Sequence, residues 1–214
     1  MEKRNENAVI QIIDYGMGNL RSVAKAFERI GVAARFCTDP EELTTATAAV
    51  LPGVGAFRDA IGQLQQTGFD AAIRDYVKGD RPLLGICLGL QLLFEESDED
   101  GRHKGLGVCG GRVERFESQP GLKIPHMGWN TVRVASDHPV MSNVPDAEHF
   151  YFVHSYFVRP SDESIVALTC EHGEQFCAAI ARGNVVATQF HPEKSQDAGR
   201  RLLESFVKTF RLTR

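Results

Sequence analysis

The feature that most constrains the fold is an alternation in the first half of the chain, where short apolar runs are separated by stretches with helical periodicity. Runs of this length and composition are typical of buried strands. Strands joined through helices form right-handed crossovers, which give a parallel sheet covered on both faces. The apolar runs occupy residues 8–13, 32–36, 48–53 and 81–87.

Helix signals lie between these runs and at the end of the chain. Residues 19–30 carry apolar side chains at helical spacing and stop before Gly31. Asp39 followed by Pro40 predicts a helix start, with Asp39 as the N-cap. Helical sequence also follows the third run to about residue 79, and residues 197–210 predict an amphipathic closing helix.

The second half is richer in strand-like segments, separated by short gaps. Such segments predict antiparallel additions or an extended mixed sheet. No linker, repeat or low-complexity tract divides residues 1–214, so we expect one domain. It should be an α/β fold of three layers, with a mostly parallel central sheet, helices on both faces and extra antiparallel strands. The additional strands are predicted at residues 113–116, 130–135, 150–158, 165–170, 176–181 and 185–190.

Composition excludes several classes of protein. The 214 residues are 43% hydrophobic and 24% charged, as in ordinary globular proteins. With 24 Lys and Arg against 28 Asp and Glu, there is no basic excess to favour nucleic acid. Five widely spaced cysteines without a C-x-x-C pair indicate neither a disulfide framework nor a zinc site. The first apolar run ends at Asp14, too short for a signal peptide, and no segment approaches the ~20 residues that span a bilayer. We therefore expect a cytoplasmic protein that binds no membrane, metal or cofactor.

The sharpest motif is Gly85-Ile86-Cys87-Leu88-Gly89, which lies between an apolar run and a helical one. It has the G-x-nucleophile-x-G spacing of a nucleophile elbow, with cysteine as the nucleophile. The glycines allow the strained turn, and a helix N-terminus favours the thiolate. The Leu88 N–H would point to a developing oxyanion. A buried cysteine in a tight turn between a strand and a helix is the alternative interpretation.

His191-Pro192-Glu193 follows the apolar run at residues 185–190 and is the best candidate for a catalytic base. A cysteine nucleophile needs a histidine base and a group that orients it. In extended chain, residues i and i+2 point the same way, so Glu193 could hold the His191 ring. A surface turn is the alternative, and the motif gains weight only because Cys87 requires a base.

A third motif, Pro52-Gly53-Val54-Gly55, closes the run at residues 48–53. Glycines there let the backbone approach a substrate closely, and an N–H of this turn could be a second oxyanion donor. A plain turn is the alternative.

Together, the strings GICLGLQ, HPEKS and LPGVGAF resemble those of the class I (triad) glutamine amidotransferases, over nearly the whole chain. Three further strings are similar to those of the glutaminase subunits of imidazole glycerol phosphate synthases, enzymes of histidine biosynthesis. They are DYGMGNLRS at 14–22, PHMGWN at 125–130 and YFVHSYF at 151–157.

The resemblance implies a flavodoxin-like fold and a mechanism. Cys87 would attack the side-chain amide of glutamine and form a thioester, His191 would move the proton, and Glu193 would orient His191. The N–H groups of Leu88 and Val54 match the oxyanion donors of the family, with the peptide between Gly53 and Val54 flipping first.

The resemblance also implies which residues bind glutamine. Gln91 and Gly55 match substrate-contacting positions, and the backbone of Ser155 and Tyr156 matches a segment that lines the same pocket. One carboxylate of an acidic run could meet the substrate ammonium, and the sequence does not select among Glu95, Glu96, Asp98 and Glu99.

The implied partner is a separate (β/α)8-barrel cyclase subunit, forming a heterodimer in which ammonia crosses the barrel. Interfaces favour the mixture of aromatic, methionine and polar side chains found at residues 126–130. Core packing is the alternative for Trp129, the single tryptophan. A carboxylate of the partner could pair with Lys194 beside the triad. By resemblance and composition, the partner-facing residues are Asn19, His126, Met127, Trp129, Asn130, Tyr151 and Lys194.

Three other functions remain as alternatives. The chain could be the glutaminase subunit of another amidotransferase or a hydrolase of γ-glutamyl peptides. It could also be a non-catalytic module derived from such an enzyme, although the intact Cys87, His191 and Glu193 argue against this.

Overall fold

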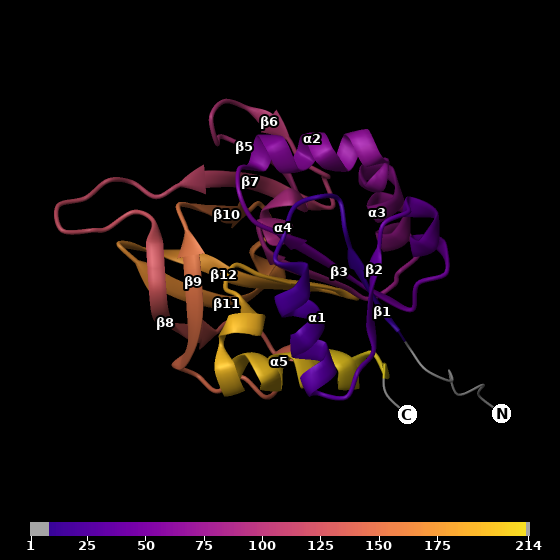
Figure 1. Ribbon diagram of the computed structural model, residues 1–214. Helices are drawn as coiled ribbons and strands as arrows, with labels where there is room; N and C mark the ends of the chain where they lie inside the picture. Colours follow the sequence, from indigo (N-terminus) through magenta and orange to yellow (C-terminus); the bar gives the residue numbers. More distant parts are fainter. Residues whose placement is uncertain (1–8, 213–214) are drawn as a thin grey trace.

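A computed structural model describes residues 9–212 (Figure 1). Five strands at one end of the sheet lie parallel in the order β2-β1-β3-β4-β13, with β2 at the edge. The inner strands are almost wholly apolar and buried, as parallel strands covered on both faces are, whereas Arg35 and Phe36 of the edge strand β2 are exposed. The strands are β1 (Ile10–Ile13), β2 (Ala34–Cys37), β3 (Ala48–Gly53), β4 (Leu83–Cys87) and β13 (Val185–Thr188).

The sheet continues beyond β13 in the order β12-β10-β7-β5-β6. The pairs from β13 through β12 and β10 to β7 are antiparallel, β5 is parallel to β7, and β6 is antiparallel to β5. These strands are β12 (Glu174–Arg182), β10 (Tyr156–Pro160), β7 (Cys109–Arg115), β5 (Phe94–Ser97) and β6 (His103–Lys104).

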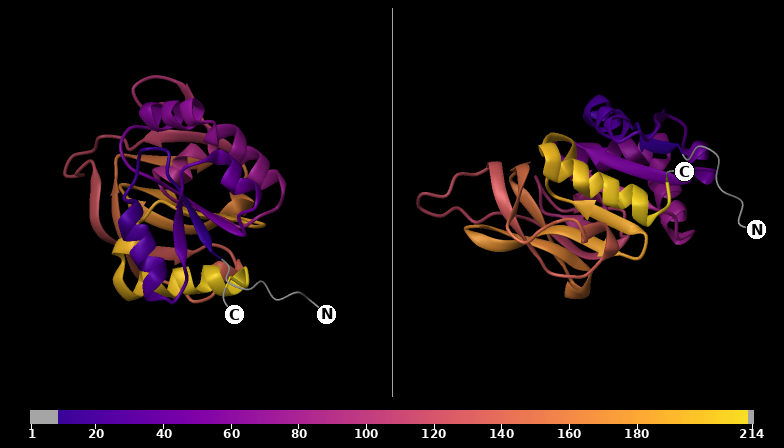
Figure 2. Two further views of the ribbon diagram at one scale, coloured as in Figure 1. Left: turned by 45° about the vertical axis from the view of Figure 1, so that its right-hand side comes forward. Right: turned by 90° about the horizontal axis from the view of Figure 1, so that it is seen from below.

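A branch of three antiparallel strands leaves the main sheet at β12. There β11 (Val166–His172) pairs with β12 and with β8 (His126–Val134), and β8 pairs with β9 (Glu148–His154). Strands β8 and β9 stand at the side of the molecule away from β2, and the long loop before β8 projects from it (Figures 1 and 2).

Helices cover both faces of the parallel strands (Figure 2). Alternate residues of β1 and β3 point to opposite faces: Ile12 and Val50 pack with Phe27 of α1, whereas Leu51 packs with Phe57 of α2. The arrangement confirms the predicted fold class. The helices are α1 (Leu20–Arg29), α2 (Phe57–Thr67), α3 (Phe69–Lys78), α4 (Leu88–Leu92) and α5 (Gln196–Thr209), with short 3₁₀ turns at Pro40–Thr44, Pro139–Met141, Glu163–Ile165 and Pro192–Lys194.

The structure corrects several predicted elements. The helical stretch up to residue 79 is two helices, because Gly68 adopts a positive φ of 79° and ends the first of them. The single strand predicted at residues 150–158 is two strands that meet at Ser155, where the chain leaves its partner β8 and joins β7. The run predicted at 185–190 ends as a strand at Thr188. Residue 8 of the first run lies outside the described residues.

None of the helices in residues 9–212 is both long and apolar enough to cross a bilayer.

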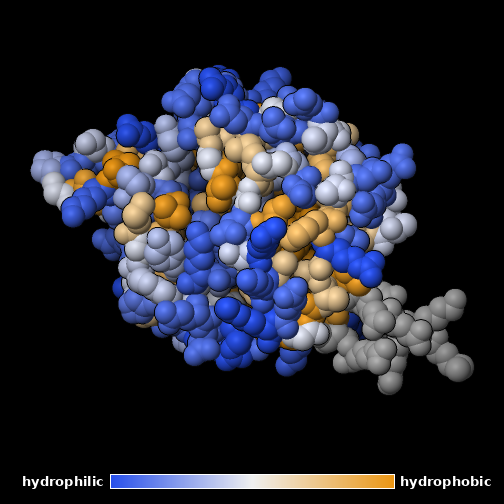
Figure 3. Space-filling model, in the orientation of Figure 1, coloured by the Kyte–Doolittle hydropathy of each residue, from blue (hydrophilic) through white to orange (hydrophobic). Residues whose placement is uncertain are grey.

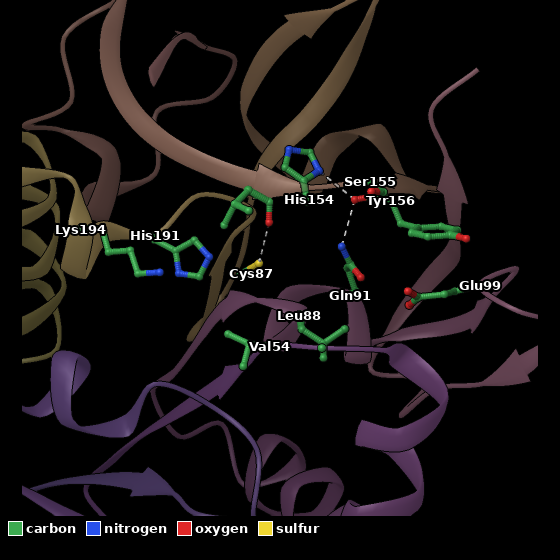
Figure 4. A pocket seen from close by; sticks show the side chains of 12 residues that line it. Val54, Cys87, Leu88, Gln91, Glu99, His154, Ser155, Tyr156, His191 and Lys194 are labelled. Carbon is green, nitrogen blue, oxygen red and sulfur yellow. Dashed lines mark hydrogen bonds between the residues drawn. The ribbon is translucent and has the colours of Figure 1, made fainter. Parts of the chain in front are cut away.

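The site lies where the parallel and antiparallel halves of the sheet meet. The C-terminal ends of β3, β4 and β13 point to one edge, and the register places Gly53 of β3 opposite Cys87 of β4. Ligands of open α/β sheets bind outside the carboxyl ends of the strands. The junction of β9 with β10 lies over the same edge (Figure 4).

Candidate active site

Cys87 occupies the predicted elbow at the end of β4. Its backbone has φ 55° and ψ −109°, a strained conformation for a residue with a side chain, and α4 begins at the next residue. A Cβ on Gly89 would lie 1.9 Å from the Leu51 carbonyl oxygen, and one on Gly85 would lie 2.7 Å from the Ala187 Cβ. Both glycines are therefore required by close packing of the turn against β3 and β13.

His191 and Glu193 form a buried pair just beyond β13. The Glu193 Oε1 lies 2.8 Å from the His191 Nδ1, and both side chains are only 2% exposed. A carboxylate accepts hydrogen bonds, so the Nδ1 carries a proton, and in the neutral form of the ring the Nε2 has a free lone pair. That Nε2 is buried and has no hydrogen-bond partner within residues 9–212. It can therefore accept a proton from the Cys87 thiol, which lines the same pocket.

The electrostatics of this pair favour a charged imidazole. Burial alone would lower the pKa of His191, but its interactions with Cys87 and Glu193 outweigh burial and raise that pKa to about 9. A protonated imidazole beside the sulfur stabilises the thiolate, which is the nucleophilic form.

Ser195 fixes the backbone that carries His191. Its Oγ donates to the His191 carbonyl oxygen at 2.6 Å and accepts from the Tyr151 N–H at 3.0 Å. The His191 N–H in turn donates to the Tyr151 carbonyl oxygen at 2.9 Å. These bonds tie the base to strand β9. Sequence reasoning missed Ser195, and its position four residues after His191 gave no distinctive signal.

A cavity of about 280 Å³ opens over Cys87 (Figure 4). It brings together eight of the predicted catalytic, oxyanion and substrate residues. It also includes Val153, His154 and Lys194. The predicted residues that line it are Val54, Gly55, Cys87, Leu88, Gln91, Ser155, Tyr156 and His191.

The turn after β3 lies beside Cys87, because the register of β3 with β4 places Gly53 opposite Cys87. Val54 lines the cavity, whereas Gly53 packs behind it, where a Cβ would lie 2.9 Å from both the Leu88 Cβ and the Tyr15 Oη. Tyr15 is buried, and its hydroxyl donates to the Pro52 carbonyl oxygen at 3.0 Å, which anchors the turn. Sequence reasoning did not identify Tyr15 as part of the site.

Gln91 presents its oxygen to the cavity. Both amide hydrogens are used inside the protein, because its Nε2 donates to the Tyr156 carbonyl oxygen at 3.0 Å and to the Gln189 Oε1 at 3.1 Å. The Oε1 is therefore the group left to meet a ligand, as a hydrogen-bond acceptor.

Among the four acidic candidates, Glu99 is the one that lines the cavity. Its carboxylate accepts from the Phe57 N–H at 2.8 Å, and burial raises its pKa. Glu95 instead accepts from the Gly111 N–H, and Glu96 pairs with Arg102. Two acceptors, Glu99 and Gln91, therefore face the same end of the cavity, which suits a ligand ammonium group (Figure 4).

The residues predicted to face a partner separate into two groups. Met127 is 63% exposed and Trp129 47% exposed, so Trp129 is not a core residue. Asn19 and Lys194 are also exposed, and Tyr151 is half-buried between Trp129 and Lys194. In contrast, the His126 ring is buried and the Asn130 amide turns inward to it at 3.1 Å. On the face seen in Figure 3, polar side chains divide the apolar surface into patches.

Within residues 9–212, no group of three or more His, Cys, Asp or Glu side chains is arranged to hold a metal ion.

Comparison with known proteins gives a consistent result. The profile of the family described as "Glutamine amidotransferase class-I" matches residues 11–210. The imidazole glycerol phosphate synthase subunit HisH of Rhodopirellula baltica is 54% identical over 199 residues, covering 93% of this chain and 97% of that protein. HisH of Geobacillus kaustophilus is 50% identical over 206 residues, covering 93% and 96%.

Solved structures share the fold at lower identity. A crystal structure of a glutamine amidotransferase superposes with a TM-score of 0.73 at 23% identity, covering 94% of this chain and 98% of that one. The structure of PurLQS from Thermotoga maritima gives a TM-score of 0.75 at 17% identity, covering 95% and 99%.

Proposed function

Because this chain belongs to the class-I glutamine amidotransferases and, within them, to the HisH subunits of imidazole glycerol phosphate synthase, we propose that it hydrolyses glutamine to glutamate and ammonia for that synthase. The family predicted from the sequence motifs is thereby confirmed. The observation that carries the reaction is the meeting of Cys87 with the buried His191–Glu193 pair in one cavity.

The chemistry begins with the Cys87 thiolate. It adds to the side-chain amide carbon of glutamine, and the negative charge on the carbonyl oxygen is met by backbone N–H groups of Leu88 and Val54. Removing one such donor typically costs about 10²–10³ in rate. The carbon–nitrogen bond then breaks as His191 gives its proton to the leaving nitrogen. Ammonia departs and a thioester remains on Cys87.

Hydrolysis of the thioester completes the cycle. His191, now neutral and still held by Glu193 at 2.8 Å, takes a proton from water, which attacks the thioester carbon. The carbon–sulfur bond breaks, glutamate leaves, and the thiolate and imidazolium are restored.

Glutamine is held by groups at the other end of the cavity. The Gln91 oxygen and the Glu99 carboxylate accept hydrogen bonds from its α-ammonium group, and Glu99 adds an opposite charge. The backbone of Ser155 and Tyr156, with Gly55, forms the walls of the pocket.

The partner we propose is a separate (β/α)8-barrel cyclase subunit in a cytoplasmic heterodimer. Ammonia would cross the barrel and convert a phosphoribulosyl formimino carboxamide ribotide into imidazole glycerol phosphate and an aminoimidazole carboxamide ribotide. Delivery inside a complex keeps ammonia from water, where it would become ammonium. Exposed Met127, Trp129, Asn19 and Lys194 support this docking face.

The test compares two nitrogen sources in the complex with the cyclase. Cys87→Ala should abolish glutamine-dependent synthesis of imidazole glycerol phosphate and leave ammonia-dependent synthesis intact. Cys37→Ala is the matched control, because Cys37 is also buried and free but burial raises its pKa to about 11. It should retain both routes. Glutamine-dependent synthesis by Cys87→Ala would refute the proposal.

A further inference from the structure

Two buried histidines next to the cavity form part of a continuous hydrogen-bonded chain that the mechanism does not use. The His126 Nδ1 lies 3.0 Å from the His154 Nε2, and the His154 Nδ1 lies 2.8 Å from the Tyr156 carbonyl oxygen. On the other side, the Asn130 Nδ2 lies 3.1 Å from the His126 Nε2. The chain starts on β8, which carries Met127 and Trp129, and ends at the wall of the cavity.

The Tyr156 carbonyl at the end of this hydrogen-bonded chain determines which atom donates in each of its bonds. A carbonyl oxygen only accepts, so the His154 Nδ1 carries a proton and, in a neutral ring, its Nε2 is an acceptor. The His126 Nδ1 must then donate to it, which leaves the His126 Nε2 to accept from the Asn130 amide. The Asn130 orientation is set independently, because its Nδ2 also donates to the Glu171 carbonyl oxygen at 2.9 Å.

The surroundings keep both rings neutral. His126 and His154 are 5% and 6% exposed, and the His126 ring is stacked between Phe152 and His172. Burial lowers the pKa of His126 to about 4 and that of His154 to about 3. Each ring therefore has one donor and one acceptor, and both are satisfied.

The chain continues from the Tyr156 carbonyl to the nucleophile. That carbonyl accepts from His154 and from the Gln91 Nε2, which fills its two lone pairs. Gln91 also donates to the Gln189 Oε1, so the Gln189 amide is oriented to donate to the Cys87 Sγ, 3.7 Å away. The orientation of Gln91, with its oxygen toward the cavity, depends on this saturated carbonyl (Figure 4).

We propose that His126 and His154 are positioning residues for glutamine binding, which hold the Tyr156 carbonyl so that the Gln91 amide keeps its oxygen toward the substrate. The inference rests on the proposed function, because it names the ligand of Gln91 as the ammonium of glutamine. The same hydrogen-bonded chain joins strand β8 to the substrate pocket through three side chains and the Tyr156 carbonyl.

The decisive variants change His154 in the complex with the cyclase. His154→Phe keeps the ring shape but removes both bonds, so the KM for glutamine should rise about tenfold, the effect of one net hydrogen bond. The kcat should change less than twofold. His154→Gln supplies one donor and one acceptor in a single amide and should restore most of the affinity. A purely structural role would not raise the KM while leaving the kcat nearly unchanged, and His154→Gln would not restore the affinity.

His126 tests whether the bonds act as one chain. His126→Phe should raise the KM as His154→Phe does, and the double variant should be no worse than either single one. His138→Phe is the matched control, since His138 also bridges two backbone groups, the Gly183 carbonyl and the Val140 N–H, but outside the site. It should leave the KM unchanged.

The outcomes separate the two proposals. A wild-type complex that does not hydrolyse glutamine would refute the proposed function. A wild-type complex that does so, with His154→Phe showing the same KM, would refute only the positioning role. Imidazole nitrogen NMR of the unmodified chain gives a test that needs no variant to fold: both His126 and His154 should carry their proton on Nδ1. An Nε2 proton on either ring would overturn the inference.

Discussion

At the scale of single residues, the site depends on buried charges that stabilise one another. The pKa of His191 is raised from 6.5 to about 9 in the folded protein. A raised pKa means that the proton binds the folded state more tightly than the unfolded one. Its contribution to stability is therefore fully present below about pH 6.5 and is lost as the pH rises through about 9. Glu193, 2.8 Å away, is one source of this shift.

Glu193→Gln should lower the pKa of His191 and slow glutamine hydrolysis, because an amide cannot stabilise the imidazolium. By analogy with other triads, the kcat should fall about 10²–10⁴-fold. A pH titration of the His191 imidazole NMR signals measures the same change, since their midpoint near pH 9 should move to lower pH. The stability lost between pH 6.5 and 9 should also shrink. An unchanged midpoint of the His191 titration would contradict this account.

The sequence predicted some site residues and not others for a physical reason. Cys87, His191 and Glu193 stand in short motifs whose local geometry determines their chemistry. Gln189 and Tyr15 act through contacts with residues distant in sequence: Gln189 bonds to Gln91, 98 positions away, and Tyr15 to Pro52, 37 positions away. No local pattern specifies such contacts.

At the scale of elements, the position of Cys87 depends on how closely α4 approaches β3. A Cβ on Gly89 would overlap the Leu51 carbonyl oxygen of β3. Helix α4 spans only Leu88–Leu92, so its position is determined by this packing rather than by its own helical stability. The same contact determines the position of the Leu88 N–H, our proposed oxyanion donor.

Gly89→Ala should therefore destabilise the fold by about 3 kcal/mol or more, as overpacking of a tight core does. It should also lower the kcat by displacing Leu88. Gly62→Ala is the matched control, because Gly62 lies in the exposed face of α2, where an added Cβ would have no atom within 4 Å apart from its chain neighbours and the backbone of its own helix. That change should stabilise the fold by about 0.5–1 kcal/mol. Denaturant unfolding measures the stability change of each variant. Equal stability changes for the two variants would show that the contact with β3 is unimportant.

The prediction of strands succeeded where one apolar run forms one strand. It failed where a continuous run pairs with two different strands. The run at residues 48–53 is β3 with the predicted bounds. At residues 150–158 the sequence is continuously strand-like, yet Ser155 separates β9 from β10. Pairing with β8 on one side and β7 on the other is decided by tertiary structure, which the local pattern does not contain.

At the scale of the whole molecule, strands β8 and β9 of the branch place an aromatic surface beside the proposed catalytic pair, His191 and Glu193. Tyr151 of β9 contacts Trp129 of β8, with ring centroids 6.2 Å apart, and its ring lies 5.9 Å from the Lys194 Nζ. The Tyr151 backbone also binds His191 and Ser195. A partner seated on Trp129 would therefore lie against β9, whose backbone holds His191, our proposed catalytic base, and this contact would couple docking to glutamine hydrolysis.

Trp129→Ala should weaken binding of the cyclase about 30-fold or more, because exposed tryptophans at the centre of an interface are common hot spots. Phe36→Ala is the matched control: Phe36 is 44% exposed, close to the 47% of Trp129, but lies on β2 at the opposite end of the sheet. It should change the dissociation constant less than twofold. Titration of the labelled cyclase with each variant measures both constants, and a thermal melt of each free subunit checks that both remain folded. If the two changes weaken binding equally, or if Phe36→Ala alone does so, the partner docks elsewhere and β8 is not its contact surface.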